Sequence, residues 1–310
     1  MGGSMFLRTC LSWLVALAIV MGFDAPLPVQ SDTDVRVYLP EVMNPERPIL
    51  FSSNRTGSYQ IYSWIPGAPE VVQLTAEPGG AYAPALSPDE QTIAFSSMRD
   101  GHFEVYTVAA NGGAAIRLTY SASWAGCASW SPDGQYLLIC SAEAGNTDIY
   151  RIDRTGANLT PLTNDPSEEY DPAWSPDGQT IAFESDRSGN YDIYLMAADG
   201  QNQRALTTSL LDEYGPDWAP DGSRLLFVQP AAASVVAVNV DGTGLATLQS
   251  TATVVSSAAW SPTGNRIVMT NLIWYHPPLH TLYVKDMLDG RSFTVPVDPN
   301  TLVDCITPDW

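Results

Sequence analysis

The chain has 310 residues, of which 45% are hydrophobic, which is enough to build a sizeable buried core. Its 34 acidic and 14 basic residues give a formal net charge of −20 at pH 7. A surface this acidic repels polyphosphate, so nucleic acid and anionic lipid are excluded as preferred partners. A negative charge of this size favours binding of cations or basic protein surfaces. Alternatively, it only keeps the protein soluble.

Residues 1–31 have the features of a targeting segment. Arg8 precedes a 13-residue apolar run from Leu11 to Phe23. Because a membrane-spanning helix needs about 20 residues, the run favours a cleaved signal peptide, with an uncleaved N-terminal anchor as the alternative. The small residue Ser31 is a candidate cleavage site, and residues 32–44 then form a linker. We therefore expect an exported protein, periplasmic or extracellular.

The remainder of the chain is an internal repeat. Strand-like segments recur with a matching apolar residue every 44 residues, at Phe51, Phe95, Ile139, Phe183 and Phe227, and once more after 42 residues, at Met269. The same step of 44 separates two further sets, Tyr62, Tyr106, Tyr150 and Tyr194, and Leu74, Leu118, Leu162 and Leu206. A repeat of this regularity overrules the prior of about two domains that the length alone suggests.

Each unit predicts four short strands. In the fourth, "YDPAWS", "TIAFES", "DIYLMA" and "RALT" are the strands, separated by a "PDG" turn, the loop "DRSGN" and the turn "ADGQN". Pro176 presets the backbone for the first turn, and Asp177 and Gly178 tolerate its tight reversal. A four-stranded unit of 40–45 residues is the period of a propeller blade, so the predicted class is all-β.

Counting the strands predicts how the ring closes. Five units are complete, beginning near Ala81, Ala125, Glu169, Glu213 and Val255. The segment before them supplies only strands two to four, and the terminal "DCITPDW" supplies only strand one. We therefore expect a six-bladed β-propeller of four-stranded antiparallel blades over residues 45–310. In it, the C-terminal strand, with Trp310, joins the N-terminal three-stranded fragment at Ile49–Ser53.

The units resemble the TolB-like propeller repeats. The pattern P-x-W-S-P-D-G-x-x-I-A-F-x-S-D-R-x-G-N-x-D-I-Y-x-M is matched nearly letter for letter from Pro172 to Met196, and the likeness extends over Pro45 to Trp310. TolB itself has an additional N-terminal domain that helps it bind periplasmic partners, and prolyl-oligopeptidase-like relatives carry a hydrolase domain with a G-x-S-x-G motif. This chain has neither feature, so the resemblance implies a free-standing propeller without peptidase activity.

Six residues that enter strand one predict an acidic, aromatic mouth to the central channel: Tyr82, Glu169, Tyr170, Asp171, Glu213 and Tyr214. Such a mouth suits a basic partner or a divalent cation such as Ca²⁺. The alternative, which we favour, is structural: each tyrosine packs between blades, and each acid caps a neighbouring loop.

Three arginines, Arg55, Arg99 and Arg187, share one position in the loop between strands two and three. They could form a ring of guanidinium groups for an anionic ligand. Because they recur at the repeat period, we favour arginines paired with acids or carbonyls inside their own blades.

The sixth blade breaks the pattern with about three extra residues and four candidate binding residues, Trp274, Tyr275, His276 and His280. Two prolines between the histidines exclude a helical metal pair. A partner-binding loop and a merely irregular loop remain as interpretations. In the third unit, Cys127 and Cys140 flank one turn, and one residue of register decides whether they can form a disulfide.

Together these features predict an exported, non-catalytic binding or scaffold propeller that recognises a protein or small ligand at the channel mouth. Two alternatives stay open: a component of an envelope complex that acts with a separate partner chain, and a lyase-like or glycosidase-like enzyme with its site in the channel. No catalytic residue and no metal ligand is assigned. We expect a monomer without a cofactor, with a bound Ca²⁺ as the alternative.

Overall fold

The computed structural model describes residues 47–252, 254–273, 279–294 and 305–309. The chain divides into two units, Met1–Asn44 and Pro45–Trp310, and every described residue belongs to the second. The described part consists of strands β1 to β24, and its only helical element is one 3-10 turn, η1 (Pro230–Ala232). The all-β class predicted from the repeat is therefore confirmed. No described helix is long and apolar enough to cross a membrane.

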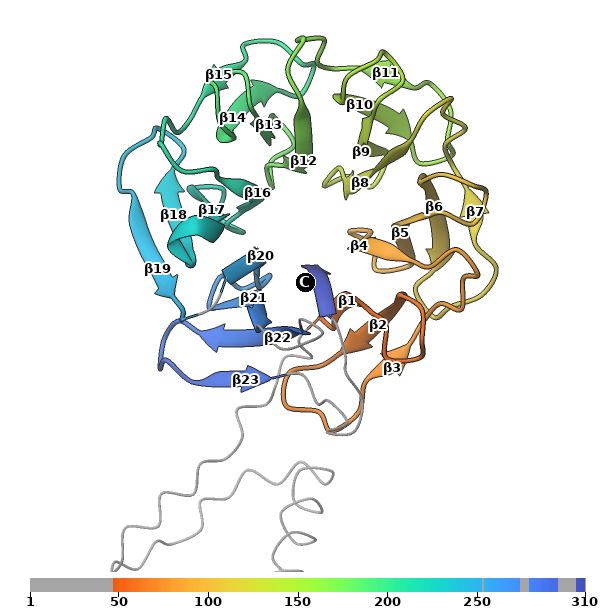
Figure 1. Ribbon diagram of the computed structural model, residues 1–310, viewed down its shortest axis with the longest axis horizontal. Coiled ribbons are helices and arrows are strands. Elements are labelled where there is room, and N and C mark those ends of the chain that lie inside the picture. The colour runs from red at the N-terminus through yellow and green to blue at the C-terminus, as the bar shows by residue number, and fades with distance from the viewer. Residues whose placement is uncertain (1–46, 253, 274–278, 295–304, 310) are drawn as a thin grey trace, which may run out of the picture. The chain divides into compact units, whose positions relative to one another are not determined.

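The strands form six antiparallel sheets of four strands, arranged as the blades of a ring (Figure 1). The first blade contains β24 (Cys305–Asp309), β1 (Ile49–Ser53), β2 (Gln60–Trp64) and β3 (Val72–Gln73). The second contains β4 (Tyr82–Leu86), β5 (Thr92–Ser97), β6 (Glu104–Ala109) and β7 (Ile116–Arg117). The third contains β8 (Ala125–Trp130), β9 (Tyr136–Ser141), β10 (Asp148–Asp153) and β11 (Thr160–Pro161).

The other three blades repeat this arrangement. The fourth contains β12 (Glu169–Trp174), β13 (Thr180–Ser185), β14 (Asp192–Ala197) and β15 (Arg204–Ala205). The fifth contains β16 (Tyr214–Trp218), β17 (Arg224–Gln229), β18 (Ser234–Asn239) and β19 (Ala246–Ser250). The sixth contains β20 (Val254–Trp260), β21 (Arg266–Ile273), β22 (Leu279–Asp286) and β23 (Ser292–Thr294). In each blade the strand named first lies nearest the centre of the ring (Figure 1).

The ring closes as predicted. β24 pairs with β1 in antiparallel register, with Leu50 opposite Asp309 and Ser53 opposite Cys305. All five residues of β1 are buried. The C-terminal strand therefore covers an edge that would otherwise present unpaired backbone groups to solvent.

Both faces of each sheet are apolar, so neighbouring blades must cover one another. Alternation along β9 shows this: Leu137 and Ile139 pack toward the second blade, whereas Leu138 packs toward the fourth. Two of the tryptophans that end strand one reach across the seams. The Trp130 Nε1 atom donates a hydrogen bond to the Ala85 carbonyl (3.1 Å), and the Trp218 Nε1 atom donates one to the Ala173 carbonyl (3.1 Å).

The PDG turns are held by one recurring network. In the fourth blade the Asp177 carboxylate accepts hydrogen bonds from the Ser175 hydroxyl (2.6 Å) and the Gln179 amide (3.0 Å). The Ser175 hydroxyl in turn accepts a hydrogen bond from the Thr180 amide (2.9 Å). These bonds hold the pKa of Asp177 below its ordinary value, with the Ser175 hydroxyl as the largest cause. We call the end of the ring that carries these turns the turn face.

In the second to fifth blades, the turn between strands three and four packs against a leucine of the preceding blade. A Cβ atom built on Gly200 would lie 2.4 Å from the Leu162 carbonyl oxygen of the preceding blade, and Gly200 has φ +86°. A side chain at this position is thus excluded both by the neighbouring blade and by the backbone conformation. The conserved spacing of the leucines and of the turn glycines along the chain reflects this contact.

Deleting residues 304–310 should destabilise the whole ring. The deletion removes β24 and leaves β1 unpaired, and at about 1 kcal/mol per lost hydrogen bond we expect a loss of roughly 3–5 kcal/mol. A thermal melt followed by circular dichroism measures the loss. A synthetic peptide of the deleted sequence, added in trans, should restore part of the stability, and a scrambled peptide should not. Equal melting temperatures for the parent and the deletion would contradict closure through β24.

Gly200→Ala should destabilise the protein more than Gly67→Ala, although the two glycines share nearly the same φ, +86° and +85°. Around Gly67 no atom lies within 4 Å of a built Cβ, so that variant reports backbone strain alone, about 1–2 kcal/mol. Gly200→Ala adds the clash with the preceding blade, and we expect a further cost of at least about 1 kcal/mol. Chemical denaturation of both variants measures the difference. Equal losses would mean that the Leu162 contact contributes nothing.

Candidate functional site

One end of the channel, which we call the mouth, is formed by the loops that enter the innermost strands and by the loops between strands two and three. A chain of aromatic rings crosses three blades there. Trp124 stacks on Tyr170 with ring centroids 6.1 Å apart and 13° between the planes. Tyr170 contacts Tyr191 at 6.3 Å, and Tyr191 contacts Tyr214 at 5.3 Å. A second group, Tyr59, Tyr82 and Phe103, lies on the first two blades.

Tyr82, Tyr170 and Tyr214 occupy the same place in three blades, and all three are half-buried. The Tyr170 hydroxyl accepts a hydrogen bond from the Thr147 hydroxyl (3.0 Å) and donates one to Glu168 (3.1 Å). These tyrosines thus pack between blades, as the structural interpretation expects, while part of each ring stays accessible. In the third blade the equivalent residue is Gly126, and a Cβ atom built on it would lie 3.6 Å from the Trp124 ring. Trp124 therefore occupies the space near this position.

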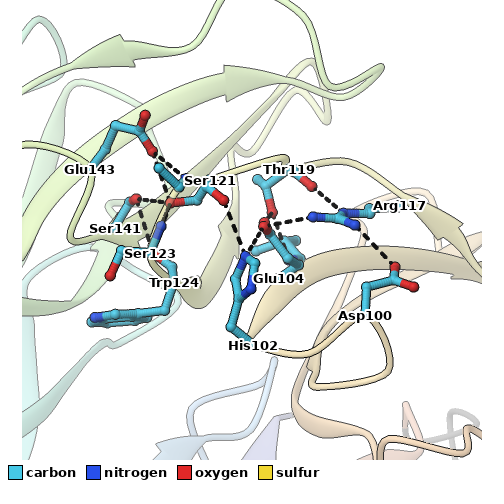
Figure 2. Close-up of polar contacts among 12 residues, drawn as sticks. Asp100, His102, Glu104, Arg117, Thr119, Ser121, Ser123, Trp124, Ser141 and Glu143 are labelled. Atoms are coloured by element: carbon cyan, nitrogen blue, oxygen red, sulfur yellow. Dashed lines mark hydrogen bonds and ion pairs between the residues drawn. The ribbon is translucent and has the colours of Figure 1, made fainter.

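The loop that carries Trp124 is held by the polar network in Figure 2. The Ser141 hydroxyl donates a hydrogen bond to the Trp124 carbonyl (3.0 Å). The Glu143 carboxylate accepts hydrogen bonds from the Ser121 hydroxyl (2.8 Å) and the Ala122 amide (3.1 Å). These hydrogen bonds fix the backbone of the loop, and the stack on Tyr170 orients the Trp124 ring.

The same network extends to a buried carboxylate that the sequence analysis did not single out. Glu104 is fully buried and accepts hydrogen bonds from Arg117 (2.8 Å) and from the Thr119 hydroxyl. His102 Nε2 lies 2.8 Å from the same carboxylate and 3.1 Å from the Ser121 carbonyl (Figure 2). The Thr119 hydroxyl also accepts a hydrogen bond from the Val105 amide (2.8 Å). Because threonines recur at this position, in Thr75, Thr163 and Thr207, the network is a structural feature of the blade.

Glu169 and Glu213 are not surface groups of the mouth, because both side chains are buried. The Glu169 Oε1 atom accepts hydrogen bonds from Arg187 (3.0 Å) and the Ser185 hydroxyl (3.1 Å). Its Oε2 atom is buried without a hydrogen-bond partner among the described residues, as is Oε2 of Glu213. Burial raises the pKa of Glu169 to about 7, although Arg187 acts against it, and burial also raises the pKa of Glu213. These two acids therefore stabilise contacts inside their blades.

The three arginines of the loop between strands two and three each stay within or next to their own blade. Arg187 pairs with Glu169 and lies over the Tyr194 ring at 4.8 Å. Arg99 pairs with Glu77 (2.7 Å), and Arg55 lies 4.8 Å from the Tyr62 ring. Their contacts match the structural interpretation, and they are not assembled into one anion site.

Asp171 is an exposed acid on the innermost strand of the fourth blade. It lies in a bulge of β12 with φ +44°. Glu184 of β13 lies beneath it, is buried, and accepts a hydrogen bond from the Gly215 amide (3.1 Å). Burial, and then the charge of Asp171, raise the pKa of Glu184 well above its ordinary value. Glu184 was not among the residues predicted from the sequence; its charge departs from the repeat, because the corresponding positions are Ser96 and Cys140.

Four candidate binding residues belong to the sixth blade. Trp274, Tyr275 and His276 lie outside the described residues. His280 lies in β22 opposite Leu272, and its side chain is likewise outside the described part. The cysteines Cys127 and Cys140 are both free thiols.

The described residues contain no group of three or more histidine, cysteine, aspartate or glutamate side chains placed to hold a metal ion. A groove of about 500 Å³ lies at the turn face, between the fourth and fifth blades, and is lined in part by Pro176, Leu195 and Trp218. The indole of Trp218 is already hydrogen-bonded in the seam. Asp177 and Asp221 line the same groove, so the turn face also places acids beside an aromatic ring. The rings that are linked across three blades, however, lie at the mouth.

The family model described as the TolB β-propeller domain matches residues 40–137 and 122–282. Among solved structures, TolB from Acinetobacter baumannii is 20% identical with a TM-score of 0.72, over 84% of this chain and 65% of that one. The chain thus spans less than two thirds of that TolB. A TolB from Agrobacterium tumefaciens is 23% identical with a TM-score of 0.61, over 82% of this chain and 92% of that one.

An oligogalacturonate lyase in complex with manganese is 19% identical with a TM-score of 0.55, over 78% of this chain and 72% of that one. At these identities the likeness shows the fold alone. Among proteins with curated functions, none matches this chain in sequence.

The stability of the protein should fall as pH rises from about 4.5 to about 7. In this window folded Glu169 keeps a proton that the unfolded chain releases, so unfolding becomes easier with rising pH. The shift from 4.5 to about 7 corresponds to at most about 3 kcal/mol. Glu184, Asp148 and Glu213 have pKa values shifted in the same direction, because burial raises each of them. Thermal melts across this range measure the trend.

Glu169→Gln is the matched variant, since glutamine keeps the shape and cannot titrate. Its melting temperature should depend less on pH between 4.5 and 7 than that of the parent. An unchanged slope would show that Glu169 does not carry a raised pKa.

Proposed function

This chain belongs to the TolB β-propeller family, and from that membership and the geometry of the mouth we propose that it is an exported, non-catalytic protein that binds basic segments of partner proteins at the mouth. The observation that carries the proposal is the aromatic chain from Trp124 through Tyr170 and Tyr191 to Tyr214, which crosses three blades.

The charge around these rings supports a cationic partner. Acids lie on the loops between and beside them, namely Glu143, Glu168, Asp186 and Asp212. Several of them also cap backbone amides: Glu168 accepts from Thr147 and Asp212 from Tyr191, at 3.1 Å each. Both functions are compatible, because a carboxylate that accepts one backbone hydrogen bond still carries its charge. Aromatic faces with nearby carboxylates attract guanidinium and ammonium groups.

Exposed apolar side chains on the same loops support a protein rather than a small cation as the partner. Met98 is 45% exposed, Tyr120 is 77% exposed and Leu210 is 97% exposed. Each is on a loop of the mouth. Exposed apolar and aromatic side chains bordered by polar groups are typical of a protein-binding surface.

The test compares short extended peptides that differ only in carrying arginine, lysine, glutamine or glutamate at alternate positions, with binding followed by fluorescence polarisation. The basic peptides should bind, and their affinity should fall with added salt. Tyr191→Ala should weaken that binding roughly tenfold, because the variant breaks the aromatic chain at its centre.

Tyr136→Ala is the control, since Tyr136 is a half-buried tyrosine at the turn end of β9. It should leave binding unchanged. Equal binding of the glutamate peptide, or equal weakening by the two variants, would show that the attraction is not specific to the mouth.

A further inference from the structure

Two cysteines of the third blade lie on neighbouring strands, Cys127 in β8 and Cys140 in β9. The ladder pairs Gly126 with Cys140 and Ser129 with Leu138. Two residues of β8, Cys127 and Ala128, therefore lie opposite a single residue of β9, Ile139. In a regular ladder Cys127 would point to the side of Ile139, away from Cys140. The bulge, with φ +54° at Cys127, breaks that alternation, and the two thiols lie close enough for each to shift the pKa of the other.

Both thiols lie at the seam with the fourth blade. Cys140 is on the same side of β9 as Leu138, which packs against Ile181 and Phe183 of β13. Asp171, the exposed acid on the innermost strand of the fourth blade, interacts with both cysteines. Cys127 is partly exposed, whereas Cys140 is fully buried. A reagent in the channel can therefore reach the Cys127 sulfur directly, but it can reach the Cys140 sulfur only through Cys127.

The repeat does not explain these cysteines. The equivalent pairs of positions in three other blades are Ala83 and Ser96, Asp171 and Glu184, and Gly215 and Val228. A residue that a blade needs for packing recurs at the period of 44, as the phenylalanines and leucines do. The thiol pair occurs in the third blade alone among these four, which indicates a property of this protein rather than of the fold.

We propose that Cys127 and Cys140 are a redox pair that closes to a disulfide in the wall of the channel. The oxidant is a low-molecular-weight disulfide. The Cys127 thiolate attacks one of its sulfurs, which breaks the S–S bond and releases the first reduced thiol. The Cys140 sulfur then attacks the Cys127 sulfur, which forms the bridge and releases the second. The two protons of the cysteines end on the two released thiols, and two electrons pass to the oxidant.

The surroundings set the order of these steps. The neighbouring Cys140 thiol lowers the pKa of Cys127, although burial and the charge of Asp171 outweigh it and leave that pKa raised. Burial raises the pKa of Cys140 well above its ordinary value. Cys127 is thus the better nucleophile as well as the accessible one, and the exchange should be slow at neutral pH and faster at alkaline pH.

The test uses the full chain with Cys10→Ser and Cys305→Ser, so that only this pair can react. The reduced protein is incubated with oxidised glutathione at mildly alkaline pH and analysed by intact mass spectrometry. The expected product is about 2 Da lighter, without bound glutathione, and has no thiol that iodoacetamide alkylates after unfolding. Retention of two alkylatable thiols, or accumulation of glutathione on either cysteine, would overturn the proposal.

Cys140→Ser in the same background tests the order of attack. This variant should retain one glutathione on Cys127, because no second sulfur displaces it. In the native reduced protein, alkylation should modify Cys127 well before Cys140. Equal rates for the two residues would refute the inferred order, and the parent background decides the bridge itself even if this variant fails to fold.

Discussion

Each blade is a thin sheet with two apolar faces, and it cannot cover either face by itself. The rest of the structure follows from this constraint, because the blades must stand side by side, and only a closed ring leaves no face exposed. The seams accordingly hold the large buried side chains, including Phe51, Phe95, Phe183 and Phe227. The turn contacts, such as Gly200 against Leu162, fix how far one blade can slide on the next. Stability is therefore shared around the ring rather than stored in one core.

A ring built from near-identical units would present a near-symmetric channel, and the features that we propose to be functional are departures from that symmetry. The linked aromatic chain runs over the third, fourth and fifth blades, and the carboxyl pair Asp171 and Glu184 and the thiol pair Cys127 and Cys140 lie in the third and fourth. The recurring arginines and the threonines beside strand three are structural. Residues that recur at the repeat period are thus structural, whereas residues that do not recur are particular to this protein. The non-recurring residues lie together in one sector of the channel.

The fold could be predicted almost completely from the sequence, because a period of 44 residues constrains strands, turns and blade number at once. The shared first blade followed from strand counting and is confirmed by the pairing of β24 with β1.

The candidate site was harder to predict from the sequence than the fold. Glu169 and Glu213 were open to two interpretations, as mouth acids or as structural acids, because the pattern does not show which way a residue at the start of a strand points. Both are buried in the structure. The bulge that turns Cys127 toward Cys140 has a positive φ that recurs at Ala83, Asp171 and Gly215, and a glycine marks this position in only one of the four blades. Glu104, His102 and Trp124 meet only through loops from two blades, so their network could not be read from spacing.

The pairing of β1 with β24 also has a consequence for the order in which the protein acquires its structure. These partners are separated by roughly 250 residues, and long-range pairings of this kind form late and slowly. During synthesis the N-terminal blade exists as three strands while the four-stranded blades that follow it are completed one after another. Until β24 has been made, the nascent ring remains an open arc with an unpaired inner edge at β1. A factor that shields this edge during synthesis or transport would therefore act on the first blade, far in sequence from the strand that finally replaces it.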